Sequence, residues 1–394
     1  MKDATRATSA GRTPEAQAGA VNPPVYHAST IVFPTLEAMR ETRSAREGEA
    51  VTYGVHGTPG TFAFEEAVAA LEGGYRTRLC NSGLQAVTAP LLCLLSPGDH
   101  LLMVDSCYAP TRRFCDGMLR RMGVETSYYD PLIGGGIAEL IRENTRVVFV
   151  ESPGSVTFEV QDIPAIAEAA HADGAWVVMD NTWATPLFFK PFSHGVDVSV
   201  QAVTKYISGH SDLVMGCVTA TEAAYEPIQR GWAELGLCGS PDDTFLALRG
   251  LRSLPARMRQ HQENGLALAR WLMEREEVAE VIHPALEHDP GHALWKRDFA
   301  GAASLFSFVL DPSCDTEARL SALCDRRRHF GLGYSWGGFE SLMTLNRPER
   351  LRTATPWPRP GRPAGPVIRV HVGLDDPEDL IADLAEGFDA MHAA

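Results

Sequence analysis

The chain has 394 residues, more than one hydrophobic core usually supports, so we expect two domains. A hydrophobic content of 45% with 22% charged residues is typical of a soluble globular protein, and a formal charge of −15 argues against non-specific nucleic-acid binding. No apolar run reaches the length of a membrane span, and residues 1–20 lack the apolar core of a secretory signal. We therefore expect a protein that binds neither nucleic acid nor membrane, with a loosely held N-terminal arm.

The eight cysteines contain no CxxC pair, a spacing that fits neither a zinc ribbon nor a small disulfide scaffold. Several lie in apolar stretches, as reduced core cysteines do. We therefore expect a cytoplasmic protein and no metal site.

The first part of the chain, residues 1–57, carries prolines and little periodicity, which indicates an extended arm. From residue 58 to about 250, helices alternate with short apolar strands. Helices are expected near 62–71, 84–95, 111–122, 137–143 and 164–172, and strands near 76–79, 100–104, 124–128, 146–150, 175–179 and 196–200. This alternation favours an α/β domain with a parallel-rich sheet flanked by helices, in which ligands bind beyond the carboxyl ends of the strands.

The regular alternation of helices and short strands ends after about residue 251. A long helix at 261–276 and a strand at 304–310 are followed by a proline-dense turn at 356–366, a strand at 367–372 and a final helix at 377–391. We expect a second, smaller α+β domain over 251–394.

Asp180 and Lys205 each follow an apolar strand and therefore lie at carboxyl ends. A lysine amine at such a place can form a Schiff base, because burial lowers its pKa; alternatively its stem packs while the amine reaches water. An acid and a lysine at one crevice is the arrangement that pyridoxal phosphate needs, since the lysine binds its aldehyde carbon and the acid keeps its ring nitrogen protonated. Asp180 could equally cap a helix or a turn.

Asn81-Ser82-Gly83 lies where a strand turns into a helix. The N–H groups of such a helix terminus, with a hydroxyl beside them, can bind a phosphate, or the serine can be an N-cap without a ligand. Thr204 could add a hydroxyl to the same phosphate. Tyr108 follows the strand at 100–104, where its ring could stack on a ligand or pack in the core.

Arg369 lies inside the apolar strand at 367–372. A buried arginine requires an anion, and a carboxylate suits its planar guanidinium; Asp375 or Asp376 could be that partner instead of a ligand. Residues 334–338 have the glycines of a loop that approaches a ligand closely. The lysine, the acid, the phosphate cradle and the carboxylate clamp together predict a pyridoxal-phosphate enzyme.

Several stretches resemble the Cys/Met-metabolism family of pyridoxal-phosphate enzymes, and the resemblance runs from about residue 22 to residue 391. Within that family the chain is most similar to the bacterial β-lyases that cleave cystathionine. The matching stretches are Asp130-Pro131-Leu132-Ile133-Gly134, Glu151-Ser152-Pro153-Gly154-Ser155, Met179-Asp180-Asn181-Thr182-Trp183, Ala202-Val203-Thr204-Lys205-Tyr206, Gly209-His210-Ser211-Asp212, Trp295-Lys296-Arg297-Asp298-Phe299, Tyr334-Ser335-Trp336-Gly337-Gly338 and Ile368-Arg369-Val370-His371-Val372-Gly373-Leu374.

The resemblance implies the aspartate-aminotransferase-like fold, type I among pyridoxal-phosphate enzymes, and a homotetramer built from two tight dimers. It implies that Lys205 is the Schiff-base lysine, Asp180 the partner of the ring nitrogen and Tyr108 the stacking tyrosine. The remaining implied roles are phosphate binding by Gly83, Leu84 and Thr204, contact with the neighbouring subunit's cofactor by Tyr53, substrate α-carboxylate binding by Arg369, and lining of the substrate pocket by Ser335 and Trp336.

Two positions depart from the family pattern. Family members carry an arginine where this chain has Val55, and the β-lyases have an acid where it has Arg113. Both positions face the cofactor or the substrate in the family. Either the cofactor phosphate is bound more weakly because Val55 supplies no charge, or Arg113 restores positive charge to the pocket, binds substrate and favours one with a distal carboxylate; we favour the second.

The activity that the resemblance implies is a carbon–sulfur β-lyase that cleaves L-cystathionine, or a related cysteine thioether, to pyruvate, ammonia and a thiol such as homocysteine. One rival is a γ-synthase or γ-lyase acting on homoserine esters or cystathionine. Another is a regulatory protein that binds the cofactor and has little turnover. A nicotinamide oxidoreductase is disfavoured, because no GxGxxG follows the first strand of the 58–250 domain.

Overall fold

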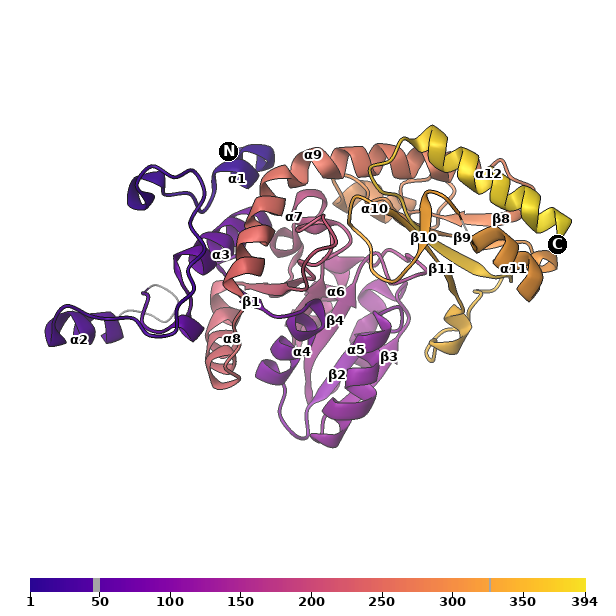
Figure 1. Ribbon diagram of the computed structural model, residues 1–394. Coiled ribbons are helices and arrows are strands. Elements are labelled where there is room, and N and C mark those ends of the chain that lie inside the picture. Colours follow the sequence, from indigo (N-terminus) through magenta and orange to yellow (C-terminus); the bar gives the residue numbers. More distant parts are fainter. Residues whose placement is uncertain (45–49, 326) are drawn as a thin grey trace.

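The computed structural model describes residues 1–44, 50–325 and 327–394. In these residues the strands form two sheets, one in each half of the chain (Figure 1). The fold is the parallel-rich α/β architecture that the sequence predicts, with a smaller α+β part at the C-terminal end.

The first sheet has seven strands in the order β1-β7-β6-β5-β4-β2-β3. Its strands are β1 (Arg76–Cys80), β2 (His100–Val104), β3 (Glu125–Tyr129), β4 (Thr145–Glu151), β5 (Trp176–Asp180), β6 (Val198–Gln201) and β7 (Gly216–Ala220). The pairs from β3 to β6 are parallel, whereas β7 is antiparallel to both of its neighbours. The strand β7 is absent from the sequence prediction, so the sheet is mixed rather than fully parallel.

Helices cover both faces of the first sheet (Figure 1). They are α3 (Pro59–Glu72), α4 (Gly83–Leu94), α5 (Ala109–Phe114, continued by a π-helical turn Cys115–Leu119), α6 (Ile163–Ala172), α7 (Thr185–Phe188) and α8 (Glu222–Glu234). Strands β2 and β4 are fully or almost fully buried, as expected for strands covered on both faces. The helix expected at 137–143 is instead a 3-10 helix, Gly134–Leu140, because three consecutive glycines disfavour an α-helix there.

The second sheet has five strands in the order β10-β11-β12-β9-β8. They are β8 (Val278–Ile282), β9 (Leu305–Leu310), β10 (Phe330–Leu332), β11 (Ser341–Asn346) and β12 (Val367–His371), accompanied by α10 (His292–Asp298), α11 (Glu317–Cys324) and α12 (Pro377–Ala393). A separate hydrophobic cluster fills the space between this sheet and α11 and α12. The second half of the chain therefore has its own core.

A single helix, α9 (Pro241–Leu272), joins the two halves and runs along the top of the molecule in Figure 1. It packs on α3 at one end and on α12, β8 and β9 at the other. The sequence predicts this helix only from residue 261, so the expected boundary at 250/251 falls inside it. Its first half contains two prolines, Pro241 and Pro255, together with several charged residues, and these hide the helical pattern.

The expectation of a loosely held N-terminal arm is wrong for its first residues. Helix α1 (Asp3–Ser9) packs on α3 and α9, and Ala7 is fully buried. Arg252 of α9 donates hydrogen bonds to the carbonyl oxygens of Ala7 and Ala10, both at 2.8 Å. The contact uses small alanines rather than large apolar residues, so a search for apolar runs could not find it. The arm continues with α2 (Leu36–Ser44).

The segment 347–362 ties the second half to the end of β2. Asp105, which follows β2, accepts hydrogen bonds from the backbone N–H groups of residues 353–355, each at 3.0 Å, and from Arg112. Burial raises the pKa of the Asp105 carboxyl, but these hydrogen bonds outweigh burial and hold the pKa below its usual value. Arg352 adds an ion pair with Glu159 at 2.7 Å. This connection fixes the second sheet beside the carboxyl ends of the first.

Candidate active site

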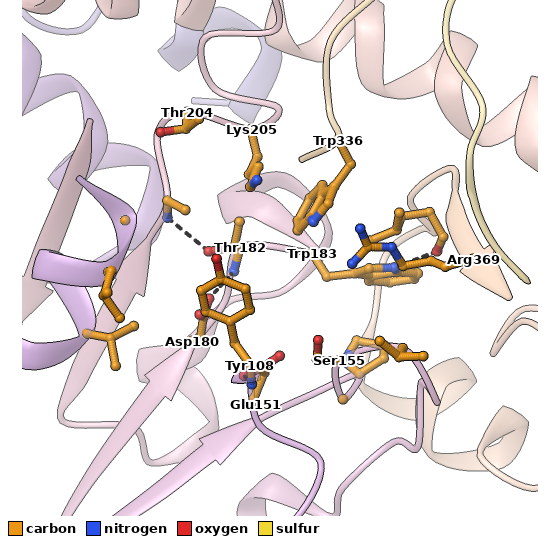
Figure 2. A pocket seen from close by; sticks show the side chains of 18 of the residues that line it. Tyr108, Glu151, Ser155, Asp180, Thr182, Trp183, Thr204, Lys205, Trp336 and Arg369 are labelled. Atoms are coloured by element: carbon orange, nitrogen blue, oxygen red, sulfur yellow. Dashed lines mark hydrogen bonds between the residues drawn. The ribbon is translucent and has the colours of Figure 1, made fainter. Parts of the chain in front are cut away.

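A cavity of about 250 Å³ lies at the carboxyl ends of β2, β4, β5 and β6, between the N-terminal end of α4 and strand β12 (Figure 2). Its wall includes Gly83, Leu84, Tyr108, Glu151, Asp180, Thr204, Lys205, Trp336 and Arg369. A second cavity of about 440 Å³ shares Tyr108, Lys205 and Arg369 with the first and extends to Arg113 and Ser335. The structure thus gathers the predicted site residues from both halves of the chain, Tyr53 excepted.

Lys205 lies four residues beyond the end of β6, and its side chain points into the cavity (Figure 2). Its Nζ donates a hydrogen bond to Ser335 Oγ at 2.6 Å and lies 5.3 Å from the centroid of the Trp336 ring. Burial and the nearby Arg369 lower the pKa of Lys205 to about 8, and Asp180 opposes the shift. More of this amine is therefore unprotonated near neutral pH than of an ordinary exposed lysine, and the unprotonated form is the nucleophile.

The loop that carries Ser335 packs directly against the backbone of Lys205. Ser335 itself has φ +83°, a left-handed conformation that strains a residue with a Cβ. At Gly337, with φ +88°, an added Cβ would lie 2.6 Å from the backbone nitrogen of Tyr206. His371 of β12 accepts the Gly337 N–H at 3.0 Å and stays neutral, because burial lowers its pKa to about 3. The strained loop is held in the place where it meets the lysine amine.

Asp180 ends β5 and faces the same cavity. Its Oδ1 accepts the backbone N–H of Thr182 at 3.0 Å. Burial raises the pKa of Asp180, while Thr182 and Lys205 oppose the shift. Glu151, the neighbour of Asp180 across the β4–β5 pair, accepts the backbone N–H of Tyr108 at 2.8 Å.

The first turn of α4 forms the wall that sequence reasoning assigned to a phosphate. Ser82 is the N-cap and accepts the Gln85 N–H at 3.1 Å, while the N–H groups of Gly83 and Leu84 belong to the first turn and have no intrahelical acceptor. An added Cβ at Gly83 would lie 2.5 Å from Cβ of Ala202, so only glycine allows this close approach. The helix N-terminus supplies donors suited to a phosphate.

Thr204 lines the cavity, but its hydroxyl is already engaged. Oγ1 donates to the carbonyl oxygen of Met215 at 3.1 Å and accepts the Met215 N–H at 3.0 Å. Phosphate oxygens only accept hydrogen bonds at neutral pH, so this hydroxyl would have to leave Met215 in order to donate to one.

Arg369 lies in β12, between Ser307 of β9 and Thr344 of β11 in the register. Among the described residues no carboxylate pairs with it. Asp375 accepts a hydrogen bond from Ser341 at 2.9 Å instead, and Asp376 caps α12. Burial lowers the pKa of Arg369, partly offset by Tyr108. The competing structural pairing is therefore excluded, and the guanidinium faces the cavity.

Tyr108 lies in the walls of both cavities, and Arg113 lies in the wall of the second. Burial raises the pKa of the Tyr108 hydroxyl, and the cations Arg113 and Arg369 reduce this shift. Arg113 is exposed, and within the described part of the chain it forms no ion pair. Tyr53 lies outside both cavities, half-exposed, in a β-bridge with Thr30. Its expected role concerns a neighbouring subunit and stays a prediction.

Glu151, Ser155, Thr182 and Trp183 are among the wall residues that occur in the family motifs but to which the sequence prediction gave no role. Glu151 could have been found by the rule that found Asp180, since both end a parallel strand. Trp183 donates its indole N–H to the carbonyl oxygen of Leu305 at 2.9 Å, a contact between the two halves that no local pattern reveals.

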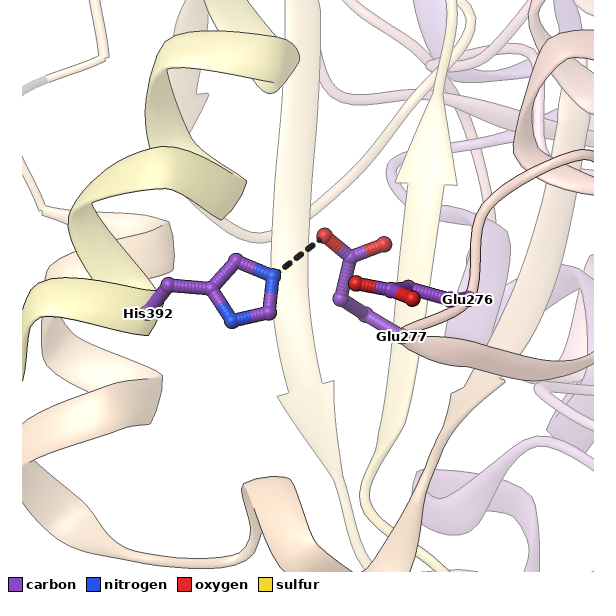
Figure 3. A group of neighbouring side chains, drawn as sticks. All are labelled: Glu276, Glu277 and His392. Carbon is purple, nitrogen blue, oxygen red and sulfur yellow. Dashed lines mark hydrogen bonds and ion pairs between the residues drawn. The ribbon is translucent and has the colours of Figure 1, made fainter.

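A cluster of carboxylates and a histidine lies elsewhere, at the end of α12 (Figure 3). Glu277 accepts a hydrogen bond from His392 at 2.7 Å, and Glu276 lies beside it. Both carboxylate oxygens of Glu277 also bind Arg275, at 2.7 and 3.1 Å. The cluster is an ion-pair network that fastens α12 to the turn before β8. No helix in the described residues combines the length and the apolar character that crossing a membrane requires.

Residues 4–389 match the family described as "Cys/Met metabolism PLP-dependent enzyme". The chain therefore belongs to this family, pyridoxal phosphate is its cofactor, and the fold is type I of these enzymes. It is 44% identical to cystathionine β-lyase of Salmonella typhimurium (98% of this chain, 97% of the relative) and 42% identical to that of Escherichia coli (98% and 97%). Cystathionine γ-synthase of Xanthomonas oryzae superimposes with a TM-score of 0.90 at 32% identity, covering 100% of this chain and 99% of the other.

Proposed function

We propose that this protein is a carbon–sulfur β-lyase that cleaves L-cystathionine, or a related cysteine thioether, to pyruvate, ammonia and a thiol, which is homocysteine in the case of cystathionine. One observation carries the proposal: a lysine amine with a pKa of about 8 lines one cavity together with Asp180, the first turn of α4 and Arg369, which has no carboxylate partner among the described residues. The similarity to cystathionine β-lyases over nearly the whole chain supports the choice of reaction.

The wall residues fit pyridoxal phosphate. Lys205 would hold its aldehyde carbon covalently, Asp180 would hold the proton on its ring nitrogen, and Tyr108 would stack on its ring. The first-turn N–H groups of Gly83 and Leu84 would bind its phosphate. Thr204 contributes there only if its hydroxyl leaves Met215. When bound, the cofactor supplies an electron-poor ring that withdraws electrons from Cα of the amino acid.

The protein's own groups then bind and orient the substrate and move its proton. Arg369 clamps the α-carboxylate, since an unpaired guanidinium beside the cavity matches the two carboxylate oxygens. The Lys205 amine removes the Cα proton, and Ser335 Oγ holds that amine in place. Trp336 forms one wall and excludes water. The Tyr108 hydroxyl keeps its proton at neutral pH and faces the substrate as a hydrogen-bond donor.

Arg113 would determine the far end of the substrate. In the second cavity Arg347 is paired with Asp315, and Arg352 with Glu159, which leaves Arg113 as a cation without a partner among the described residues. A distal carboxylate on the thioether would pair with it. A distal ammonium group alone would be repelled.

The assembly we propose is a homotetramer of two tight dimers, in which Tyr53 reaches the cofactor of the neighbouring subunit. The exposure of Tyr53 and its distance from its own chain's cavities support this role. Sedimentation of the holoenzyme tests the assembly, and a monomer would contradict it. We also propose a cytoplasmic location, because the eight cysteines are free thiols.

Product analysis tests the reaction. The purified protein with pyridoxal phosphate and L-cystathionine should release pyruvate and homocysteine. Release of 2-oxobutyrate and cysteine instead would indicate a γ-lyase, and thioether formation from a homoserine ester would indicate a γ-synthase, which the likeness to the Xanthomonas oryzae structure makes the second candidate. Full cofactor loading with no turnover of any thioether would indicate a regulatory protein.

A further inference from the structure

Glu151 is a second carboxyl group in the cavity wall, beside Asp180. The two residues end neighbouring parallel strands, β4 and β5, and are partners in the register. Figure 2 shows both below the cavity, with Tyr108 close by. Asp180 has a role in the proposed reaction, and Glu151 has none.

Two carboxyl groups at one buried place do not both ionise without a large cost, so the charge resides mainly on one. Asp180 is the better place for it, because the Thr182 N–H and the Lys205 ammonium both stabilise a charge there. Burial and the charge of Asp180 raise the pKa of Glu151 well above its usual value.

The other groups that face Glu151 do not reverse this preference. Among the described residues, the backbone hydrogen bond that its carboxyl accepts comes from Tyr108. Arg352 stabilises a charge on Glu151 from a distance, but its guanidinium is already paired with Glu159 at 2.7 Å. Cys107, on the same loop as Tyr108, is buried and stays a neutral thiol, because burial raises its pKa.

The loops that follow β2 and β4 are packed tightly against each other. Ser155 donates its N–H to the carbonyl oxygen of Ser106 at 2.8 Å, and an added Cβ at Gly154 would lie 2.4 Å from Ser106 Oγ. The Glu151–Tyr108 hydrogen bond is part of this junction, immediately before the first residue of α5. Loss of the Glu151 carboxyl would therefore release the Tyr108 backbone at the point where its ring enters the cavity.

We propose that Glu151 is a positioning residue that acts as a neutral carboxylic acid. Its Oε2 atom accepts the Tyr108 N–H and holds the tyrosine ring at the cavity wall. Its neutral form leaves Asp180 as the one negative charge, among the described residues of this wall, that faces the ring nitrogen of pyridoxal phosphate.

The test measures cofactor affinity. The apoprotein is titrated with pyridoxal phosphate, and binding is followed by tryptophan fluorescence. Glu151→Ala removes the acceptor and should weaken binding about tenfold, which corresponds to about 1.4 kcal/mol. Glu151→Gln keeps the acceptor and cannot ionise, so it should restore affinity to within about threefold of the wild type. Asp180→Asn is the matched loss of charge and should weaken binding far more than Glu151→Gln. The infrared difference spectrum of the wild type minus Glu151→Gln should contain the carbonyl band of a protonated carboxylic acid.

Two results would overturn the proposal. If Glu151→Gln binds the cofactor as weakly as Glu151→Ala does, or if its spectrum retains every protonated carboxyl band of the wild type, Glu151 acts through its charge. If Glu151→Ala, shown to be folded by circular dichroism, binds like the wild type, Glu151 positions nothing. The inference rests on the proposed placement of the cofactor between Tyr108 and Asp180. Because the readout is binding, it holds whichever thioether is cleaved, and a failed lyase assay leaves it intact.

Discussion

Replacing Arg369 by leucine should reduce activity and leave folding stability intact. In the free protein the half-buried guanidinium lies in β12 without a carboxylate partner among the described residues, and the loss of hydration there lowers its pKa. A partly desolvated charge without a carboxylate partner costs the folded state free energy, so its replacement by an apolar side chain is expected to be neutral or stabilising. We therefore expect the free energy of unfolding of Arg369→Leu to stay unchanged or to rise by about 1 kcal/mol.

The same substitution leaves the substrate α-carboxylate in the cavity without its partner. The loss of a close charge pair costs about 3 kcal/mol, and about 1.4 kcal/mol corresponds to a tenfold change in rate. The value of kcat/KM for cystathionine, measured by pyruvate release, should thus fall about a hundredfold or more. The variant should also lose the ability to distinguish amino acids from their amides.

The matched control is Arg112→Leu, which removes a buried arginine that is paired with Asp105. Breaking that pair should destabilise the protein by about 3–5 kcal/mol, since it leaves the buried Asp105 carboxylate without its ion-pair partner. The reasoning about Arg369 is refuted if Arg369→Leu is destabilised as much as the control. It is refuted equally if the variant still prefers amino acids over their amides.

Three further predictions follow from the site and its supports. Lys205→Ala should abolish turnover and the visible absorbance of the bound cofactor; visible absorbance equal to that of the wild type would contradict the role of Lys205. Asp105→Ala should lower the free energy of unfolding by about 3–5 kcal/mol at pH 7. Because the pKa of Asp105 is depressed in the folded state, this loss of stability relative to the wild type should be complete above the unfolded pKa of about 3.9 and should shrink as the pH falls below it. A loss of stability that is independent of pH would exclude a charge effect. Arg113→Asp should raise KM for S-(2-carboxyethyl)-L-cysteine and lower it for S-(2-aminoethyl)-L-cysteine. The control on the same helical segment is Arg121→Asp, and Val55→Arg tests cofactor affinity. An unchanged KM for both thioethers would show that Arg113 is not in the substrate site.

Much of the first sheet could be predicted from the sequence, because strand length and burial leave a clear local pattern. The strand at 100–104 was predicted to the residue, and the strand ends led to Asp180 and Lys205. The rule that ligands bind at the carboxyl ends of parallel strands was sufficient to bring these two side chains together.

What the sequence could not predict depends on contacts between distant segments. The hydrogen bond from Lys205 to Ser335 joins residues 130 positions apart. The clamp of Asp105 on residues 353–355 spans about 250 positions, and neither partner has a distinctive local pattern. Strand β7 was missed because Gly216–Ala220 mixes glycine, cysteine and threonine in a run with no alternation.

The sequence predicts a phosphate-binding role for Thr204 that its hydrogen bonds do not favour, and it predicts no role for Glu151. Thr204 stands beside the lysine, as a phosphate ligand would, yet its hydroxyl bonds to the backbone of Met215, a partner that only the fold brings near. In the sequence, Glu151 stands out only as part of a family motif. Its pairing with Asp180 becomes visible when the register of β4 and β5 is known.

The most direct test of the account is to reduce the holoenzyme with borohydride and to locate the pyridoxyl group by peptide mass spectrometry. The structure predicts that the group is on Lys205, the lysine whose amine enters the cavity and whose pKa burial lowers to about 8. A pyridoxyl group on Lys190, or on any lysine other than Lys205, would contradict the account at its centre.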